Sequence, residues 1–499
     1  MTVLALDMGS SSVRAAICDD DANPIDGRLT RREFRATQQE SGAGVIDPDV
    51  YVANVVACID ELSDAGALSG LEAVAISSQW HSVLPVDPDS GRPRAQVLTW
   101  LDTRAEPRRW PDDPEAFHAR TGAWQHTLYW TAKLPWLRER RPGPIRFVGL
   151  PDYVRRILLG SDDTSVSLAS GTGMLNHREN DWDAEALRLA GAERSELPVI
   201  DDTPRTLVGR WRDRWPELAD VPWHPAVGDG AASNLGSGAG EPGTAAITVG
   251  TSLALRVVHT EDTALPAEVW RYRVDSDRYV SGIAFSGGGV LYAWLTRMLK
   301  LDKRAGEPSG VPPGGSGLLV LPMHAGSRPP GTLPGGSGAM LGVSLDTSEQ
   351  ELIAGTLDGV SLTAANALET LEAMTGQQLR VALGGGAAYA SAWWRRSLAA
   401  ATEHEMHVVS DPEVGVRGAA AIALGLVPSC PETVVHPDAE DVRRFAGQRA
   451  RQRYLLDFVA TDAAAAGRAE AERAAEQTVA EQVAGSPKRP EGSAGRTDP

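Results

Sequence analysis

Apolar runs that end in small, hydroxyl-rich turns recur along the chain. Residues 3–6 are apolar, Asp7 closes the run, a Gly-Ser-Ser-Ser turn follows at residues 9–12, and apolar side chains alternate again over residues 13–17. This pattern predicts a strand, a tight polar turn and a second strand.

The same pattern returns in the second half of the chain. Residues 245–249 are apolar, a Gly-Thr-Ser turn follows at residues 250–252, and residues 253–258 return as a second apolar run. The glycine of this turn aligns with Gly9. Two such hairpins, one near the start of each half, predict two lobes built on a similar plan with a cleft between them.

Helix-like and strand-like segments alternate around these hairpins. Residues 49–62 have the amphipathic periodicity of a helix and precede an apolar run at residues 71–77, and residues 353–374 precede a similar run at residues 379–383. Such alternation predicts an α/β protein rather than an all-α or all-β one.

The pattern divides the chain into four segments. We expect an N-terminal lobe at residues 1–240 and a C-terminal lobe at residues 241–430. Residues 431–484 end in an Ala/Glu/Arg-rich stretch and are predicted to form a helical extension. Residues 485–499 are polar without apolar anchors, and we expect them to be disordered.

Composition narrows the class of partner. The 499 residues include 48 basic and 66 acidic ones, which gives a formal net charge of −18. A nucleic-acid partner is disfavoured because the chain has no basic cluster to neutralise phosphates. A small-molecule partner is expected instead.

The cysteines and the lengths of the apolar runs indicate the cellular compartment. The three cysteines are odd in number and far apart, which supports neither a disulfide framework nor a zinc site. Asp7 interrupts the first apolar stretch, and no run reaches the roughly 18 apolar residues that a membrane span needs. We expect a cytoplasmic protein that is not associated with a membrane.

The two hydroxyl-rich turns suit the binding of a polyphosphate. Backbone amides and hydroxyls in such turns can bind phosphate oxygens, and a carboxylate at the strand end, here Asp7, can face a magnesium ion. One Gly-Ser turn alone would most simply close a hairpin. Two of them could hold one polyphosphate from opposite lobes.

Asp229 is the candidate base. It lies between Gly228 and Gly230, where an apolar segment opens into small residues. Such a carboxylate can accept the proton of a hydroxyl that attacks a phosphoryl group. The alternative is an ordinary helix N-cap, which aspartate also satisfies.

Three consecutive glycines, residues 384–386, follow the apolar run at residues 379–383. Glycine permits close approach of a flat ligand such as adenine to the backbone. Because such triplets are also common in plain turns, this signal counts only together with the others.

Taken together, these segments resemble the FGGY carbohydrate kinases. The resemblance implies a two-lobed actin/hexokinase/Hsp70-like (ribonuclease H-like) α/β fold with duplicated domains and a central cleft. It implies that the lobe at residues 1–240 binds the sugar, that the lobe at residues 241–430 binds ATP, and that ATP and Mg²⁺ are the cofactors. It runs in consistent order from about Val3 to Val427 and rests on residues 4–12, 75–87, 98–105, 121–137, 152–160, 228–239, 246–256, 336–345, 357–366 and 382–401.

The resemblance also implies roles for individual residues. Asp229 is similar to the family's catalytic base, which also contacts the substrate, and Asp7 to a magnesium-associated carboxylate. The residues that resemble the phosphate-binding and adenosine-binding positions are Ser10, Ser11, Gly250, Thr251, Gly385 and Gly386.

Within the family the chain looks most similar to the gluconokinases. The resemblance is carried by the His-Ser-Val core at residues 81–83, by residues 229–239, and by His126 in its TG-x-x-x-H spacing. Four positions depart from the usual pattern. They are Trp80 in place of Met, Ser165-Val166-Ser167, Gly326-Ser327-Arg328 without the usual Glu, and Ala400-Ala401.

The predicted substrate-binding residues lie in the segments that resemble the family's sugar pocket. Trp80, His81, Arg104 and His126 are the candidates, with Lys133 as a further cation nearby. Gluconate is an anion, so a protein with a charge of −18 must supply local donors to hold it. A lone histidine is more often a partly buried hydrogen-bonding residue, and Trp80 could equally fill the core.

These observations predict an ATP- and magnesium-dependent kinase that converts gluconate to 6-phosphogluconate. The nearest alternative is a xylulokinase or another pentulose or polyol kinase of the same family. A different class, an actin- or Hsp70-like ATPase acting as a binding module, would lack the substrate segments around His81, Arg104 and His126. The expected partners are a sugar or sugar acid and ATP, and a homodimer is the assembly considered.

Overall fold

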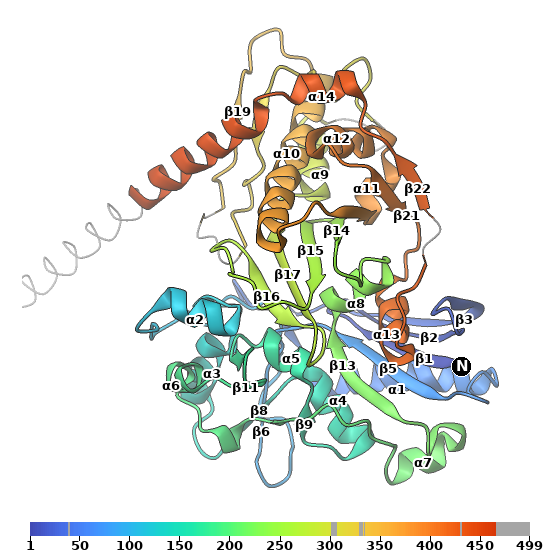
Figure 1. Ribbon diagram of the computed structural model, residues 1–499. Coiled ribbons are helices and arrows are strands. Elements are labelled where there is room, and N and C mark those ends of the chain that lie inside the picture. The colour runs from blue at the N-terminus through green and yellow to red at the C-terminus, as the bar shows by residue number, and fades with distance from the viewer. Residues whose placement is uncertain (38–39, 301–306, 329–332, 334, 430–431, 466–499) are drawn as a thin grey trace, which may run out of the picture.

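The fold is described by a computed structural model. It describes residues 1–37, 40–300, 307–328, 333, 335–429 and 432–465. Two lobes, each built on its own mixed sheet, lie one above the other in Figure 1.

The N-terminal lobe is built on a five-stranded sheet with the order β13-β5-β1-β2-β3. Strand β1 pairs antiparallel with β2, as the first hairpin predicts, and parallel with β5. The strands are β1 (Val3–Met8), β2 (Ser12–Cys18), β3 (Pro24–Glu33), β5 (Ala73–Ser78) and β13 (Trp223–Gly228).

The C-terminal lobe is built on a seven-stranded sheet with the order β16-β17-β15-β14-β20-β21-β22. Its strands are β14 (Thr244–Val249), β15 (Leu253–His259), β16 (Trp270–Arg273), β17 (Tyr279–Phe285), β20 (Arg380–Gly384), β21 (Met406–Val409) and β22 (Glu432–Val435).

The two sheets repeat one plan. The order β3-β2-β1-β5-β13 of the first corresponds to β17-β15-β14-β20-β21 of the second. In each, the hairpin is antiparallel and the strand on its other side is parallel. The prediction of an α/β protein with duplicated lobes is therefore confirmed, and the two turns occupy equivalent places.

Helices cover these sheets. The longer ones in the described chain are α1 (Pro48–Asp64), α3 (Trp130–Arg140), α4 (Leu150–Leu159), α9 (Gly289–Met298), α10 (Glu349–Thr375), α12 (Ala392–Thr402) and α13 (Val414–Leu424). The shorter ones are α2 (Pro114–Thr121), α5 (Val166–Gly171), α6 (Ala184–Ala190), α7 (Arg210–Arg214), α8 (Asp229–Gly236), α11 (Gly386–Ala390) and α14 (Ala439–Phe445).

Small two-stranded sheets and single turns of 3₁₀ helix complete the described chain. The short strands are β4 (Val45–Ile46), β6 (Leu84–Val86), β7 (Val97–Leu98), β8 (Arg146–Val148), β9 (Asp163–Thr164), β10 (Leu175–Asn176), β11 (Asp181–Trp182), β12 (Val199–Ile200), β18 (Leu319–Leu321) and β19 (Ala339–Leu341), and the 3₁₀ turns are Arg194–Glu196 and Pro216–Leu218.

Helix α10 is longer than the periodicity predicts. The apolar pattern suggested a start at residue 353, but Ser348 and Glu351 form a capping box that begins the helix at Glu349. The side chain of Ser348 accepts a hydrogen bond from the Glu351 amide, and the Glu351 side chain accepts one from the Ser348 amide. The cap extends the helix beyond its buried face.

The lobes meet where α8 crosses α13. A Cβ added at Gly418 would lie 1.7 Å from the Ala232 carbonyl oxygen, and one added at Gly236 would lie 1.8 Å from the Val414 carbonyl oxygen. Glycine is therefore required at both positions for the backbones to approach so closely. Helix α13 follows the last parallel strand of the C-terminal sheet but packs its alanines on β1 and β5 of the N-terminal lobe.

The segment after residue 431 combines a strand with helices. The predicted helical extension begins with β22, which pairs antiparallel with β21 at the sheet edge. Residues 448–465 are helical and project from the C-terminal lobe (Figure 1). Gln452 anchors this helix by donating hydrogen bonds to the carbonyl oxygens of Val320 and Gly359, at 2.7 and 2.8 Å.

The part of the extension from residue 466 onward and the predicted disordered tail at residues 485–499 lie outside the described residues. Among the helices that are described, none is both long and apolar enough to cross a membrane.

Candidate active site

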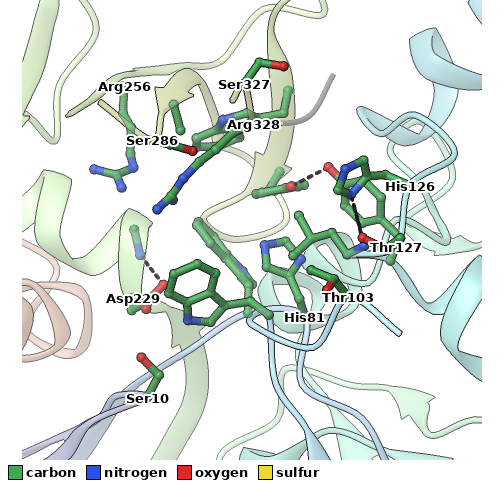
Figure 2. Close-up of a pocket in the computed structure, with 18 residues that line it drawn as sticks. Ser10, His81, Thr103, His126, Thr127, Asp229, Arg256, Ser286, Ser327 and Arg328 are labelled. Carbon is green, nitrogen blue, oxygen red and sulfur yellow. Dashed lines mark hydrogen bonds between the residues drawn. The ribbon is translucent and has the colours of Figure 1, made fainter. Parts of the chain in front are cut away.

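A cavity of about 420 Å³ lies between the lobes (Figure 2). This volume falls in the range typical of small-molecule sites, roughly 300–1,000 Å³. Most of its lining is aromatic or polar. The lining residues are Ser10, Trp80, His81, Trp100, Thr103, His126, Thr127, Leu128, Tyr129, Asp229, Gly230, Arg256, Trp270, Tyr272, Ala284, Ser286, Ser327 and Arg328.

Asp229 lies in this cavity as the first residue of α8, directly after β13 ends. Its Oδ1 accepts a hydrogen bond from the Gly230 amide at 2.8 Å. Burial raises the pKa of Asp229 to about 6, and the negative charge of Asp7 adds to the increase. A carboxylate with a pKa near the working pH is well suited to accept a proton. Its place in the first helical turn does not exclude this role, because the side chain still faces the cavity.

Trp80 forms the wall next to Asp229. A Cβ added to Gly171, Gly228 or Gly230 would lie within 2.6 Å of the Trp80 side chain, so these glycines make room for the indole. Trp80 Nε1 donates a hydrogen bond to the Ser167 carbonyl oxygen at 3.0 Å. Two departures from the family pattern, Trp80 and the Ser165–Ser167 segment, are thus in direct contact.

His81 is held in a single tautomer. Its φ of 66° is in the left-handed region, and its Nδ1 contacts the Gly171 carbonyl oxygen. Because a carbonyl only accepts, Nδ1 carries the proton and Nε2 is an acceptor. Burial and the positive charge of Lys133 lower the pKa of His81 to about 3, so the ring is neutral. His81 can therefore accept a hydrogen bond from a sugar hydroxyl.

His126 is also neutral but has the opposite tautomer. Its Nδ1 accepts a hydrogen bond from the Leu128 amide at 3.1 Å, which leaves the proton on Nε2. Burial, followed by the charge of Lys133, lowers the pKa of His126 to about 4. His126 is therefore a neutral donor rather than a cation.

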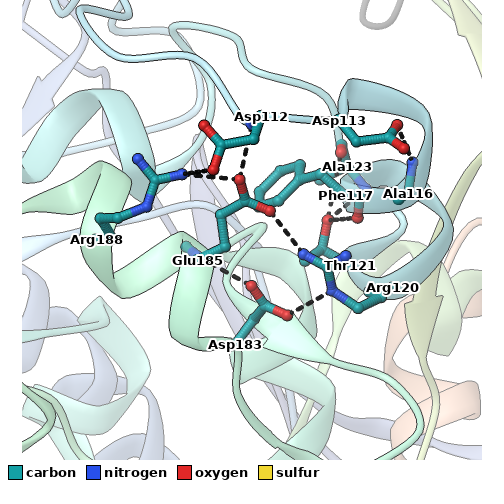
Figure 3. Close-up of polar contacts among 11 residues, drawn as sticks. Asp112, Asp113, Ala116, Phe117, Arg120, Thr121, Ala123, Asp183, Glu185 and Arg188 are labelled. Carbon is teal, nitrogen blue, oxygen red and sulfur yellow. Dashed lines mark hydrogen bonds and ion pairs between the residues drawn. The ribbon is translucent and has the colours of Figure 1, made fainter.

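An ion-pair network holds the segment that leads to His126 (Figure 3). Arg120, in the last turn of α2, pairs with Asp183 at 3.0 Å and with Glu185 at 2.8 Å. Arg188 pairs with the same Glu185 and with Asp112, at 2.9 and 3.1 Å. Helix α2 is thereby fixed against α6, and the loop after it carries residues 126–129 into the cavity.

Lys133 lies behind the cavity wall rather than in it. Its Nζ donates hydrogen bonds to the carbonyl oxygens of Thr99 and His81, at 2.8 and 3.2 Å. Burial lowers the pKa of Lys133 to about 7. Lys133 positions two wall segments and does not face the space that a substrate would occupy.

Arg104, a predicted substrate-binding residue, does not line this cavity. Its guanidinium group pairs with Asp102 at 2.6 Å and Glu40 at 3.0 Å and lies 4.9 Å from the Trp136 ring. Together with Trp136 and Arg140 it lines a separate groove of about 170 Å³. Its role in sugar binding stays a prediction that the geometry does not favour.

Two arginines that were not predicted do line the cavity. Arg256 comes from β15 and Arg328 from the loop after β18, and both point into the cleft from the C-terminal lobe (Figure 2). The signal for Arg256 was present in the sequence, because it is the one charged residue in the apolar run at residues 253–258. Arg328 lies in one of the segments that depart from the family pattern.

The first predicted phosphate turn lies beside Asp229. Gly9 N donates a hydrogen bond to the Ser12 carbonyl oxygen at 3.0 Å, which closes the turn, and Ser10 lines the cavity while Ser11 is exposed. Asp7 Oδ1 accepts a hydrogen bond from Ser77 Oγ at 3.1 Å, and its Oδ2 pairs with Arg14 at 3.3 Å. Burial raises the pKa of Asp7 despite this pairing.

The second turn and the glycine triplet lie together in the C-terminal lobe. Gly250 N donates a hydrogen bond to the Ser252 carbonyl oxygen at 3.0 Å, and Thr251 is exposed at the tip. Gly385 has a φ of 96°, and a Cβ there would lie 2.4 Å from the Val249 carbonyl oxygen. Gly385 therefore packs against the residue that precedes Gly250, and Gly250, Thr251, Gly385 and Gly386 all lie outside the lining of the 420 Å³ cavity.

The described residues contain no group of three or more His, Cys, Asp or Glu side chains that could hold a metal ion on its own. This is compatible with magnesium, which usually binds through one or two carboxylates plus substrate phosphates.

Two family models match the chain in the order of its lobes. Residues 2–236 match the N-terminal domain of the FGGY family of carbohydrate kinases, and residues 245–425 match its C-terminal domain. The chain belongs to this family. Its activity is therefore that of a carbohydrate kinase.

Known proteins similar to this carbohydrate kinase differ in their substrates. A gluconokinase of Bacillus subtilis (strain 168) is 26% identical over 465 residues, 85% of this chain and 87% of that protein. A gluconate kinase and a xylulose kinase from Lactobacillus acidophilus, both solved as crystal structures, each have a TM-score of 0.82 at 20% identity. Each comparison covers 92% of this chain and 98% of the other. The fold is shared, and the substrate differs among these relatives.

Proposed function

We propose that the chain is an ATP- and magnesium-dependent gluconate kinase that transfers the γ-phosphoryl group to the terminal hydroxyl of gluconate. The observation that carries this proposal is the position of Asp229 in a sugar-sized cavity, with a hydroxyl-rich turn from the N-terminal lobe at its side. Gluconate is preferred because the sequence segments around His81 and His126 resemble those of gluconokinases, and a gluconokinase is among the relatives.

In the proposed reaction, Asp229 accepts the proton of the attacking hydroxyl. Phosphoryl transfer depends mostly on positioning and on stabilising charge. Trp80 and Tyr272, whose rings lie 4.9 Å apart, form an apolar wall for the carbon chain. His81 Nε2 accepts from one sugar hydroxyl, and His126 Nε2 donates to another oxygen.

The turns at residues 9–12 and 250–252 would bind the triphosphate, and Gly385 and Gly386 would lie against adenosine. Asp7 suits magnesium because its buried carboxylate keeps lone pairs beyond those used by Ser77 and Arg14. When bound, the ion would neutralise phosphate charge.

A coupled assay of ADP release across gluconate, xylulose, ribulose, glycerol and erythritol tests the proposal. We expect gluconate to have the highest kcat/KM. Efficient turnover of xylulose or ribulose without gluconate would retain the sugar-kinase assignment and replace the substrate. ATP hydrolysis that is unaffected by every sugar would instead favour an actin- or Hsp70-like ATPase.

A further inference from the structure

The placement of Arg256 on its strand directs it into the cleft. Residues on β15 alternate between the two faces of the sheet. Leu253, Leu255 and Val257 belong to the core of the C-terminal lobe. Arg256 is on the opposite face and lines the cavity beside Asp229.

Two glycines leave room for the Arg256 side chain. A Cβ added at Gly282 would lie 3.1 Å from Arg256 Cγ, and one added at Gly230 would lie 3.1 Å from Arg256 Nε. Gly282 is the register partner of Arg256 on β17. The local backbone is therefore shaped to let a long side chain pass between the lobes.

The guanidinium group of Arg256 lacks a protein partner within the described residues. Its Nε is out of contact with solvent and has no hydrogen-bond partner, and within the described part of the chain Arg256 is in no ion pair. Burial lowers the pKa of Arg256, while the negative charge of Asp229 opposes this effect and the positive charge of Arg328 adds to it. A partly buried cation without a protein partner is costly, which indicates that an anion completes the site.

Arg328 brings a second cation to the same space. Its neighbour Ser327 forms an isolated β-bridge with Phe285 at the end of β17. This bridge attaches the loop that carries Arg328 to the sheet. The Arg328 guanidinium lies 5.0 Å from the centre of the Trp100 ring. In Figure 2 the guanidinium groups of Arg328 and Arg256 lie next to each other above Asp229.

The charge balance of the cavity favours an anionic ligand. His81 and His126 are neutral, so neither can neutralise a carboxylate. Among the described lining residues, Asp229 is the one carboxylate, against two arginines. A neutral sugar would leave these two cations without a counterion.

We infer that Arg256 and Arg328 together bind the carboxylate of a sugar-acid substrate and thereby select sugar acids over neutral sugars. This inference rests on the proposed function and names the residues that determine its substrate class. Arginine suits this role because its planar group can donate two parallel hydrogen bonds to one carboxylate. A polyol that replaces the carboxylate by a hydroxymethyl group cannot neutralise the two cations.

The test compares gluconate with glucitol, which has the same carbon chain without the carboxylate. Calorimetry without ATP measures gluconate binding to the wild type and to Arg256→Gln and Arg328→Gln. The control is Arg297→Gln, which replaces an exposed arginine of α9 in the same lobe. We expect Kd and KM for gluconate to rise at least about tenfold in both cavity variants. We expect no change in the control, and the preference for gluconate over glucitol should fall.

Each contrary result separates the inference from the proposed function. Unchanged gluconate binding in both cavity variants, with correctly folded protein, overturns the inference and leaves gluconate as substrate. If kcat falls equally for gluconate and glucitol while the Kd of gluconate is unchanged, the arginines contact the transferred phosphoryl group instead. That result also overturns the inference. A wild type that turns over xylulose but does not bind gluconate overturns the substrate itself. Arg328→Lys should recover only part of the binding, because lysine keeps the charge but not the paired donors.

Discussion

At the scale of single residues, Asp229 is suited to accept a proton but lowers the stability of the fold. The carboxylate that would accept a proton is also buried, and its pKa of about 6 exceeds its ordinary value of 3.8. Because the folded protein holds the proton more tightly than the unfolded chain does, ionised Asp229 destabilises the fold above pH 6. This penalty is absent at pH values below 3.8. The proposed active site therefore lowers stability at neutral pH.

Asp229→Asn is expected to abolish phosphorylation and to stabilise the protein. The amide keeps the shape but cannot accept the proton, so kcat should fall by at least about 10³-fold while ATP affinity stays near wild type. Removal of a buried charge relieves a cost on the order of 2–3 kcal/mol at pH 7.5, so Tm should rise by a few degrees. Enzyme assays, nucleotide calorimetry and thermal unfolding measure these effects. Activity within a few-fold of wild type would contradict the assignment of the base.

The pH profile of the wild type should report the same carboxylate. As pH falls through about 6, Asp229 takes up a proton and kcat/KM for the sugar should decline tenfold per pH unit. His81 and His126, with pKa values of about 3 and 4, stay neutral across this range. The charges of Asp7 and Arg256 act on Asp229, and Arg328 lies next to Arg256 above it (Figure 2). A profile that is flat between pH 5 and 8 would show that Asp229 does not limit the reaction.

Some site residues can be recognised from their neighbours in the sequence, and others only from the three-dimensional structure. Asp229 and Ser10 follow strands directly, so strand ends and small residues mark them in the sequence. Arg104 was assigned by proximity in sequence to a sugar-pocket segment, but its side chain turns to Asp102 and Glu40. Arg256 stands out as the one charged residue in an apolar run, but the tertiary packing that brings it to the cavity is not encoded by that local pattern.

At the scale of secondary-structure elements, the sequence predicted the hairpins, the α/β class and the helices before β5 and β20. Strand β22 was missed, because four residues at a sheet edge carry little periodic signal. The α8–α13 crossing was also missed, since its basis is the close approach of Gly236 and Gly418 to backbones nearly 200 residues away. Such contacts require the three-dimensional arrangement.

Gly418→Ala tests this crossing. A methyl group would lie 1.7 Å from the Ala232 carbonyl oxygen, so the two helices must move apart. Overpacking of this kind costs roughly 1–3 kcal/mol or more, and in a chain of this length we expect Tm to fall by about 1–3 °C or more. Ala423→Ser, at a partly exposed position of α13, is the control and should change Tm by no more than about 0.5 °C. Equal stability of both variants would show that the helices can separate without cost.

At the scale of the whole molecule, each ligand would contact both lobes. The acceptor cavity takes His81 and Asp229 from the N-terminal lobe and Arg256 and Tyr272 from the C-terminal lobe. The proposed triphosphate site likewise joins the turn at residues 9–12 to the turn at residues 250–252. The duplicated sheets place these turns at equivalent points, so closing the cleft would complete both sites together.

Gluconate and nucleotide should therefore strengthen each other's binding. Whichever ligand binds first would favour the closed arrangement and reduce the cost of closure for the second. We expect a non-hydrolysable ATP analogue with Mg²⁺ to lower the Kd of gluconate roughly 5- to 100-fold, and gluconate to lower the Kd of the analogue by the same factor. Calorimetric titration of each ligand with and without the other measures both factors. Equality of the two is required by thermodynamics and serves as the internal check. Affinities that are independent of each other would mean that the lobes do not close around the two sites together.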